Sequence, residues 1–244
     1  MRGDGVTDLK IYLDNTQKPW GKLFYKIVWE QLSFVKSLKL LDFGSGFGIT
    51  ASHMAAFNEV LAIEPNKQMC EMSFKDNEYS QIVGGIEVLS KIPKRSYDLI
   101  ICHNVLEYVD NKNDYISAFS ELLKIGGKLS LIKHNHTGRV MQKVIFENDI
   151  EQALQLINGE TAFAQNFGEI KYYDFLEIDK WINMYGFKII DTLGIRTFFA
   201  LHPDNSIRQN EKWLKSMFEL ELRSSRMEEF KNIAFYNHVI LEKV

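Results

Sequence analysis

Residues Leu40–Thr50, LLDFGSGFGIT, place glycines at alternating positions directly after a short apolar run that contains an acid. The apolar run predicts a buried strand, Lys39–Phe43, and the residues after the glycines predict a helix, Ile49–Phe57. Glycine lets the backbone turn tightly and approach a ligand more closely than a residue with a Cβ atom. Because a parallel sheet binds ligands beyond the carboxyl ends of its strands, we expect either a ligand site or a plain glycine-rich turn here.

The pattern around this stretch predicts alternating strands and helices up to residue 133, which is typical of a doubly wound α/β sheet. The expected strands are 39–43, 60–63, 81–83, 97–102 and 128–133, and the expected helices are 20–34, 49–57, 67–74 and 113–123. Gly126-Gly127 is expected to stop the last of these helices. The rest of the chain predicts helices 141–156, 177–185 and 211–226, a loop 163–173, and strands 187–197 and 233–242. The last strands, separated by one helix, suggest an antiparallel addition at the edge of the sheet.

Length and composition indicate one domain of an ordinary globular protein. The chain has 244 residues, 45% of them hydrophobic and 25% charged. We expect four parts in it: 1–36 as an N-terminal arm and helix, 37–135 as a ligand-binding core, 136–185 as a helical lid, and 186–244 as C-terminal strands and helix.

The composition also argues against several classes of protein. A formal net charge of −3 disfavours a protein that coats nucleic acid by bulk charge. Cys70 and Cys102 do not have the spacing of a metal or disulfide framework, so we expect no metal. The first residues lack the pattern of a secretory signal, and no apolar run approaches the roughly 18–20 residues of a membrane span. We therefore expect a cytoplasmic protein.

The spacing of the glycines distinguishes between kinds of nucleotide site. A dinucleotide fingerprint would need a third glycine where Ile49 stands, and the Gly-Lys-Ser/Thr ending of a P-loop is absent. The pattern acid-x-Gly-x-Gly-x-Gly, at Asp42, Gly44, Gly46 and Gly48, resembles the first motif of class I S-adenosylmethionine-dependent methyltransferases. This resemblance implies a Rossmann-like, seven-stranded sheet, mostly parallel with an antiparallel C-terminal strand. It also implies that Asp42 balances the charge of the cofactor's methionine amino group.

Further segments resemble later motifs of that family. Glu64 ends the strand VLAIE and would accept hydrogen bonds from the ribose hydroxyls. In VGGIEV, Ile86 would face the adenine, while Glu87 would reach its amino group or remain in solvent. His103, in YDLIICHNVLEYV, would lie near the methionine part or serve as a buried structural histidine. The residues implied to bind S-adenosyl-L-methionine and its product S-adenosyl-L-homocysteine are Asp42, Gly44, Ser45, Gly46, Gly48, Glu64, Pro65, Gly85, Ile86, Glu87 and His103.

The acceptor half carries a narrower resemblance. Segments 126–145, 193–199 and 219–243 are similar in order and spacing to the bacterial tRNA 5-carboxymethoxyuridine methyltransferases, which esterify a carboxylate on the wobble uridine of tRNA. A carboxylate is ionised at pH 7 and needs alignment and a partner for its charge rather than a general base. The resemblance suggests Arg139 and Arg196 as acceptor-positioning catalytic residues, and His103 as a further catalytic candidate. Arg223 and Arg226 are weaker candidates, because arginines on a helix are commonly solvated or paired with glutamates.

Other acceptors and functions stay open at this point. From residue 187 to the C-terminus there are nine Lys and Arg against eight Asp and Glu, fewer basic residues than tRNA phosphates would favour. Leu23-Phe24-Tyr25 also stands where the tRNA enzymes are expected to carry an arginine. A small-molecule O- or N-methyltransferase, with His134 or His136 as base, is the first alternative. A non-catalytic protein that binds S-adenosylmethionine is the second.

Overall fold

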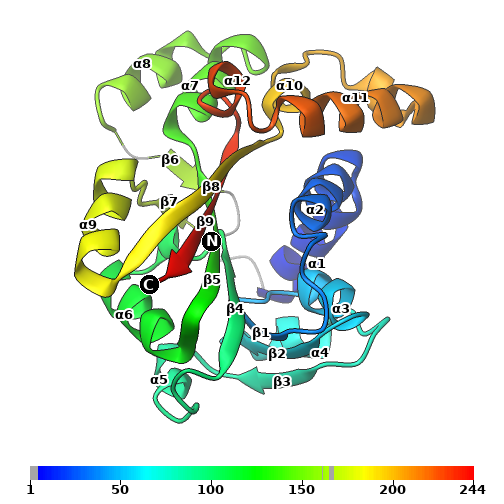
Figure 1. Ribbon diagram of the computed structural model, residues 1–244. Helices are drawn as coiled ribbons and strands as arrows, with labels where there is room; N and C mark the ends of the chain where they lie inside the picture. Colours follow the sequence, from blue (N-terminus) through cyan, green and yellow to red (C-terminus); the bar gives the residue numbers. More distant parts are fainter. Residues whose placement is uncertain (1–4, 161, 165–167) are drawn as a thin grey trace. The chain divides into compact units, whose positions relative to one another are not determined.

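The computed structural model describes residues 5–160, 162–164 and 168–244 (Figure 1). Within these residues a seven-stranded sheet has the order β3-β2-β1-β4-β5-β9-β8. The neighbouring pairs from β3 to β5 are parallel, whereas the C-terminal strands add an antiparallel pair, as predicted. The strands are β1 Lys39–Phe43, β2 Glu59–Glu64, β3 Ser80–Val83, β4 Tyr97–His103, β5 Leu123–His134, β8 Phe187–Ile195 and β9 Tyr236–Lys243. Strand β1 has β2 on one side and β4 on the other, so the order of the strands reverses at β1. The carboxyl end of β1 is therefore a topological switch point.

The remaining elements are mostly helices. They are α1 Gly5–Gln17, α2 Pro19–Gln31, α3 Ile49–Ala55, α4 Lys67–Glu71, α5 Ile86–Leu89, α6 Lys112–Leu122, α7 His136–Ile145, α8 Ile150–Ile157, α9 Phe175–Tyr185, α10 Thr197–Leu201, α11 Glu211–Ser224 and α12 Glu228–Lys231. Short 3-10 helices cover Leu106–Tyr108 and Ser206–Gln209, and β6 Ala162–Ala164 pairs antiparallel with β7 Gly168–Ile170.

The described residues form two compact units. Unit 1 is drawn from 1–30, 133–172 and 192–238, and unit 2 from 31–132, 173–191 and 239–244. In unit 2, α3 lies on one face of the sheet and α6 and α9 lie on the other (Figure 1). Leu41, Ile100 and Phe119 are fully buried in its core. The α6–α9 layer is fixed by a hydrogen bond from Trp181 Nε1 to Asn113 Oδ1, 2.9 Å long.

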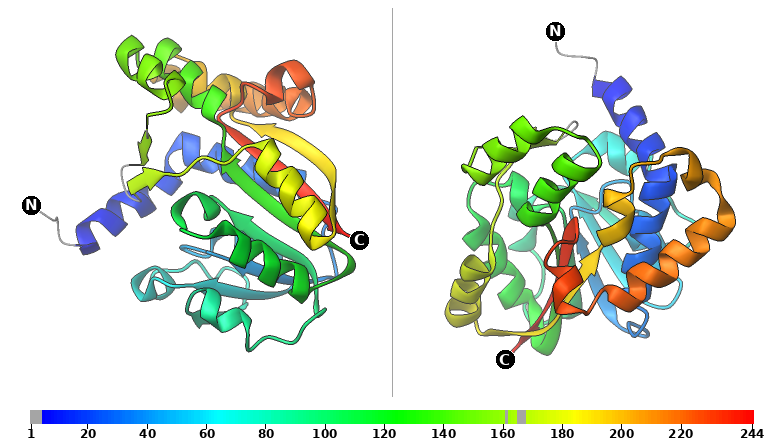
Figure 2. Two further views of the ribbon diagram at one scale, coloured as in Figure 1. Left: turned by 90° about the vertical axis from the view of Figure 1, so that its left-hand side faces the viewer. Right: turned by 90° about the horizontal axis from the view of Figure 1, so that it is seen from above.

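Unit 1 is built mainly from helices around the ends of β8 and β9. Helix α11 runs beside α2 (Figure 2), where Lys26 Nζ lies 4.2 Å from the centre of the Phe218 ring. Helix α7 approaches the chain before β9 very closely. A Cβ atom on Gly138 would lie 2.0 Å from the carbonyl oxygen of Ala234, so this crossing requires glycine.

Several elements differ from the sequence-based predictions. Residues Gly5–Gln17 form a helix where an arm was expected. The helix was not predicted because its sparse apolar residues give no clear helical pattern. The expected helix 141–156 is two helices, interrupted at Asn148 with φ 52° and restarted by Asp149, whose side chain accepts the Gln152 N–H. The expected loop 163–173 includes most residues of the paired strands β6 and β7, and its residues 165–167 lie outside the described part of the chain.

The glycine pair Gly126-Gly127 has a different role from the predicted helix stop. Helix α6 ends at Leu122, and Leu123 already begins β5. Gly126 has φ +78°, and the register between β4 and β5 shifts between Tyr97 and Leu99. The glycines therefore lie in an irregular part of the strand rather than between the helix and the strand.

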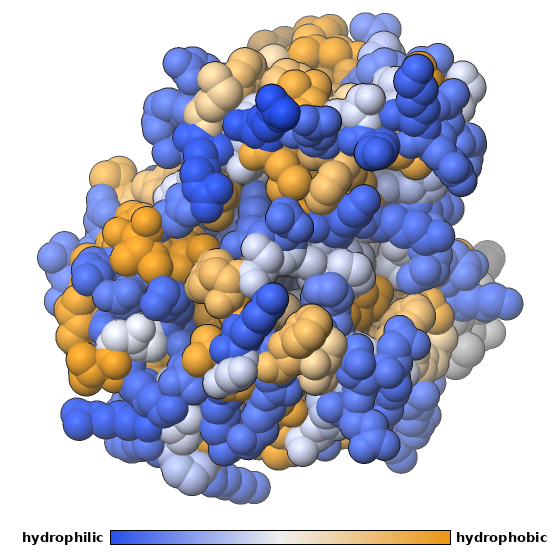
Figure 3. Space-filling model, turned by 45° about the vertical axis from the view of Figure 1, so that its right-hand side comes forward, coloured by the Kyte–Doolittle hydropathy of each residue, from blue (hydrophilic) through white to orange (hydrophobic). Residues whose placement is uncertain are grey.

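The surface carries both polar and apolar side chains. On the face in Figure 3, hydrophilic and hydrophobic residues are interspersed. None of the helices in the described ranges is long and apolar enough to cross a membrane.

Candidate active site

The glycine turn after β1 has a left-handed backbone at each of its three glycines. Gly44, Gly46 and Gly48 have φ angles of +72°, +54° and +68°. A Cβ atom on Gly44 would lie 2.3 Å from a methyl carbon of Val105, so the backbone is closely packed there. In contrast, a Cβ atom on Gly46 would have no described atom within 4 Å. The turn therefore leaves open space over Gly46, as a loop that cradles a ligand requires.

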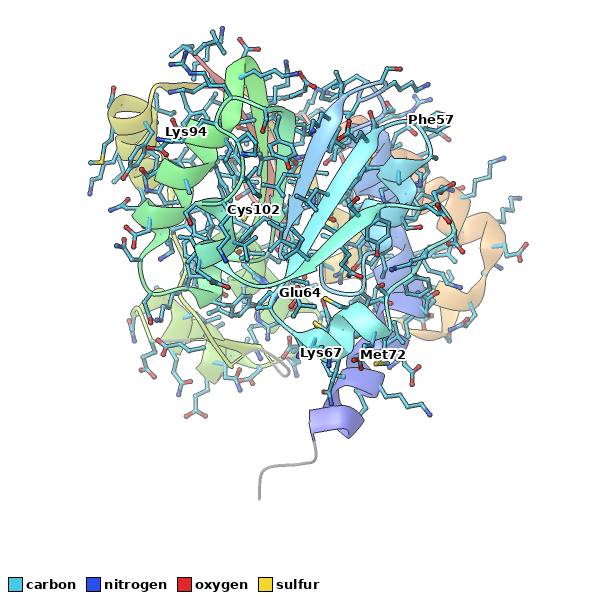
Figure 4. All side chains as sticks on the ribbon, turned by 90° about the horizontal axis from the view of Figure 1, so that it is seen from below. Phe57, Glu64, Lys67, Met72, Lys94 and Cys102 are labelled. Atoms are coloured by element: carbon cyan, nitrogen blue, oxygen red, sulfur yellow. The ribbon has the colours of Figure 1, made fainter. Side chains whose placement is uncertain are left out.

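Glu64 closes one side of this turn from the end of β2. Figure 4 shows it at the end of the strand away from Phe57, near Lys67 at the start of α4 and Met72 directly after that helix. Its carboxylate accepts the N–H of Gly46 (2.8 Å) and the N–H of Asn66 (2.9 Å). Burial raises the pKa of Glu64, and these hydrogen bonds oppose that rise. Each carboxylate oxygen keeps a further lone pair, so Glu64 can still accept ribose hydroxyls.

Asp42 is the buried acid of the motif. It is 3% exposed, and its Oδ2 has no hydrogen-bond partner among the described residues. Burial, followed by the charge of Glu64, raises the pKa of Asp42 to about 7, against an opposing hydrogen bond from the Ala51 N–H. A buried carboxylate oxygen without a partner is costly, and an ammonium group would compensate it. The Asp42 environment therefore fits the methionine end of the cofactor.

The other residues predicted for the cofactor also lie in unit 2. Ser45 Oγ is buried without a hydrogen-bond partner in the described structure, whereas Pro65 is exposed. Glu87 is exposed, and its carboxylate accepts the Gly85 N–H (2.7 Å), which lowers its pKa. Ile86 is half-buried at the start of α5. These positions are compatible with the predicted adenine contacts.

His103 and its neighbour form the end of β4. His103 Nε2 shares a hydrogen bond of 2.7 Å with Ser130 Oγ of β5. Asn104, which the sequence analysis did not select, has φ +54°, and its Oδ1 is buried without a hydrogen-bond partner among the described atoms. An asparagine directly after a buried strand is a signal for such a left-handed position. Asn104 is therefore an additional candidate at the same end of the sheet.

The predicted acceptor residues lie in unit 1, and Arg196 has the most distinctive environment. It is 7% exposed and connects β8 to α10 with a left-handed backbone, φ 60° and ψ 53°. Its guanidinium carbon lies 5.2–5.9 Å from the ring centres of Trp20, Phe199, Phe235 and Tyr236. Burial lowers the pKa of Arg196, and a hydrogen bond to Tyr236 opposes this effect. Its Nε has no hydrogen-bond partner within the described structure.

The other arginines are engaged differently. Arg139 Nη1 hydrogen-bonds to Gln142 and forms an ion pair with Glu147 (3.0 Å). Arg223 is exposed and paired with Glu219, and Arg226 is also exposed. The buried, partly unpartnered Arg196 is thus better suited to hold an anion than these residues.

Arg208 is a buried arginine that the sequence analysis did not select. Its Nη2 donates to the carbonyl oxygens of Phe199 and His202, 3.1 and 2.8 Å away. Burial lowers the pKa of Arg208, with a further contribution from the charge of Arg196. The two guanidinium groups therefore contribute to one positive region in unit 1.

The pKa of His134 is also affected by the positive charges in this region of unit 1. It is buried, and its pKa is lowered to about 3, first by burial and then by the charges of Arg139, Lys133 and Arg196. The imidazole is neutral at pH 7 and too weak a base to assist a neutral acceptor. His136 Nε2 is engaged with the Leu156 carbonyl oxygen (2.9 Å). The local chemistry favours an acceptor that is already negatively charged.

Comparison with known proteins identifies the class. Residues 41–131 match a family model described as "Methyltransferase domain". A putative S-adenosylmethionine dependent methyltransferase from Listeria monocytogenes has a similar structure, with TM-score 0.62, 13% identity, and 90% of this chain and 98% of that chain covered. The phosphoethanolamine N-methyltransferase 2 of Haemonchus contortus, solved with S-adenosyl-L-methionine, has TM-score 0.55 and 17% identity, covering 96% of this chain and 60% of that one. The chain is a class I S-adenosylmethionine-dependent methyltransferase.

Relatives of known function narrow the comparison. The tRNA 5-carboxymethoxyuridine methyltransferase of Escherichia coli K12 is 25% identical over 238 residues, covering 91% of this chain and 89% of the relative. The mitochondrial ubiquinone biosynthesis O-methyltransferase of Schizosaccharomyces pombe is 24% identical over 168 residues, covering 65% of this chain and 60% of the relative. In the described residues, no group of three or more His, Cys, Asp or Glu side chains could hold a metal ion.

Proposed function

We propose that this enzyme methylates a carboxylate on a modified wobble uridine of tRNA, in the cytoplasm. The observation that carries the proposal is the buried guanidinium of Arg196, which is caged by aromatic rings and keeps an unpartnered Nε among the described residues. Guanidinium groups bind carboxylates in a planar, bidentate geometry. The match to the tRNA enzyme of E. coli extends over 91% of the chain and includes this part.

The residues divide the chemistry as follows. S-adenosylmethionine supplies an electrophilic methyl group. Asp42 and Glu64 bind the cofactor through its ammonium group and ribose, and the glycine turn lets it approach the backbone. Arg196 binds the acceptor and neutralises its charge while leaving a carboxylate oxygen able to react. A general base is not required, which agrees with the weak basicity of His134.

The main alternative is a small acceptor methylated on a neutral oxygen or nitrogen. The relationship to ubiquinone O-methyltransferases and the net charge of −3 favour it. It would need a general base, and the pKa of His134, about 3, disfavours that residue.

The product distinguishes these possibilities. The purified enzyme is incubated with methyl-labelled S-adenosylmethionine and with tRNA from a bacterial strain that carries unmethylated 5-carboxymethoxyuridine. A methyl ester releases its label as volatile methanol in alkali, whereas an ether or an N-methyl group retains it. We expect alkali-labile label that disappears when the tRNA is first digested with RNase. Alkali-stable label, or transfer to a cell extract that survives RNase, would contradict the proposal.

Arg196 provides the residue-level test. Each hydrogen bond to a charged group contributes roughly 1.5–3 kcal/mol, so the loss of even one of them in Arg196→Ala should lower kcat/KM for this tRNA by at least about tenfold. Arg196→Lys should restore little, because an ammonium lacks the bidentate geometry. Calorimetry with S-adenosylhomocysteine should show an affinity within about twofold of the wild type for both variants. Arg223→Ala, at an exposed ion-paired arginine, is the matched control and should retain activity.

A further inference from the structure

The backbone around Arg196 is held by a buried acid from a distant part of unit 1. Glu221 lies on α11 and is 1% exposed. Its Oε2 accepts the N–H of Thr197 (2.7 Å), and its Oε1 accepts the N–H groups of Phe198 (2.9 Å) and Phe199 (2.8 Å). These are the first N–H groups of α10, which have no intrahelical acceptor. Glu221 therefore caps α10 from outside the helix.

This cap determines the conformation of the preceding residue. Arg196 is the N-cap residue of α10 and has a left-handed backbone, which is unfavourable for a residue with a side chain. The neighbouring chain is fixed to the same end of α11, because the Gly194 N–H donates to the Ser225 carbonyl oxygen (2.7 Å). Helix α11 therefore holds the turn on both sides of Arg196, and the direction of the guanidinium depends on it.

The charge of Glu221 acts on Arg196 as well. Each charge favours the ionised form of the other, against the effect of burial on both pKa values. The carboxylate oxygens are engaged by backbone N–H groups, while Arg196 Nε keeps no partner among the described residues. Glu221 thus compensates the buried guanidinium electrostatically and leaves donor capacity for an anion.

We propose that Glu221 is the positioning residue for Arg196: it fixes the left-handed turn and stabilises the charged guanidinium in an acceptor-binding orientation. This inference rests on the proposed function of Arg196. The sequence alone gave no reason to select Glu221, since it lies in a helix with several exposed acids.

A double-mutant cycle tests whether Glu221 acts through Arg196. The probe is tRNA carrying 5-carboxymethoxyuridine, with labelled S-adenosylmethionine as donor. Glu221→Gln, which keeps the shape but removes the charge, should lower kcat/KM about tenfold in the wild-type background. In the Arg196→Ala background it should have almost no further effect. Additive effects in the cycle would overturn the proposal, because a general loss of fold would act equally in both backgrounds.

A spectroscopic measurement separates this inference from the proposed function. The ¹⁵Nε–H resonance of Arg196, assigned by comparison with Arg196→Lys, should move and exchange faster with solvent in Glu221→Gln. It should remain unchanged in Glu219→Gln, the matched control at an exposed acid of the same helix. An unchanged resonance in Glu221→Gln would overturn the positioning role even if Arg196 binds the acceptor. If Arg196→Ala retains full activity, the proposed function fails, and the resonance decides the conformational role alone.

Glu221→Asp keeps the measurement possible if the glutamine variant does not fold. The aspartate retains the charge on a side chain one methylene shorter. It should restore the Arg196 resonance and at least part of kcat/KM relative to Glu221→Ala. Equal losses in Glu221→Asp and Glu221→Ala, with an unshifted Arg196 resonance in both, would contradict the positioning role.

Discussion

The ionised carboxylate of Asp42 is unfavourable in the free protein, and we expect the cofactor's ammonium group to stabilise it. Its buried Oδ2 has no hydrogen-bond partner among the described residues, and its pKa is raised from 3.8 to about 7 by burial and by the charge of Glu64. As pH rises, the unfolded chain releases this proton first. The stability that Asp42 contributes is therefore complete below the unfolded pKa and is lost as pH rises through about 7. An ammonium group bound to Asp42 would stabilise the ionised carboxylate and lower its pKa.

Asp42→Asn should separate these effects. The amide cannot ionise, so the free variant should lose less stability between about pH 5 and about pH 8 than the wild type. Because the ammonium group binds the ionised form of Asp42, the affinity of the wild type for S-adenosylhomocysteine should increase by up to roughly tenfold for each unit by which the pH is raised toward 7. The variant should bind weakly and with little pH dependence. Thermal unfolding and calorimetry across this range measure both effects. An asparagine variant with wild-type affinity would show that Asp42 does not hold the ammonium group.

The glycine turn shows that neighbouring glycines in one element have different functions. Gly46 and Gly48 both have positive φ angles, so a side chain is strained at either position. A Cβ atom on Gly48 would also lie 1.9 Å from the Tyr79 hydroxyl, whereas one on Gly46 meets no described atom within 4 Å. Gly48 is therefore constrained by packing within the fold, whereas Gly46 borders open space that we expect the ligand to occupy.

Alanine should mainly reduce cofactor affinity at Gly46 and mainly reduce stability at Gly48. Gly46→Ala should cost about 1–2 kcal/mol of stability from its left-handed backbone and abolish most of the cofactor affinity. Gly48→Ala should lower the melting temperature further than Gly46→Ala, because Tyr79 must move. It should reduce cofactor affinity less than Gly46→Ala does. Chemical unfolding and binding of S-adenosylhomocysteine test the pair. A Gly46→Ala variant that binds normally would place the cofactor elsewhere.

Sequence patterns predicted elements well where local chemistry determines them. The strand Lys39–Phe43 was predicted from an apolar run, and the tight turn after it was predicted from its glycines. The exchange of an expected helix stop for an irregular strand at Gly126 depends on pairing with β4, which no local pattern reveals. The same holds for the site: Asp42 and Glu64 belong to a motif, but Glu221 reaches α10 across 22 to 24 positions of sequence. Contacts of that range depend on tertiary packing.

For the whole molecule, the charge balance limits how nucleic acid can bind. The chain has 29 Lys and Arg against 32 Asp and Glu, and several arginines that could meet phosphates are paired or buried in unit 1. Each phosphate contact to a single strand contributes about −0.7 to the slope of log affinity against log salt concentration. Few contacts therefore mean a shallow slope.

We expect a tRNA acceptor to bind with few phosphate contacts. The affinity for an anticodon stem-loop that carries 5-carboxymethoxyuridine should fall with a slope of magnitude below about 3, as measured by fluorescence anisotropy over roughly 50–200 mM salt. The same stem-loop with an unmodified uridine should bind more weakly, with the same slope, because it lacks the carboxylate that we propose Arg196 binds. That carboxylate would add a local interaction rather than release a phosphate counterion. Arg196→Ala should remove this difference between the two stem-loops and leave the slope unchanged. Equal binding of the two stem-loops by the wild type would mean that the wobble carboxylate is not recognised, and the enzyme would then act on a different acceptor.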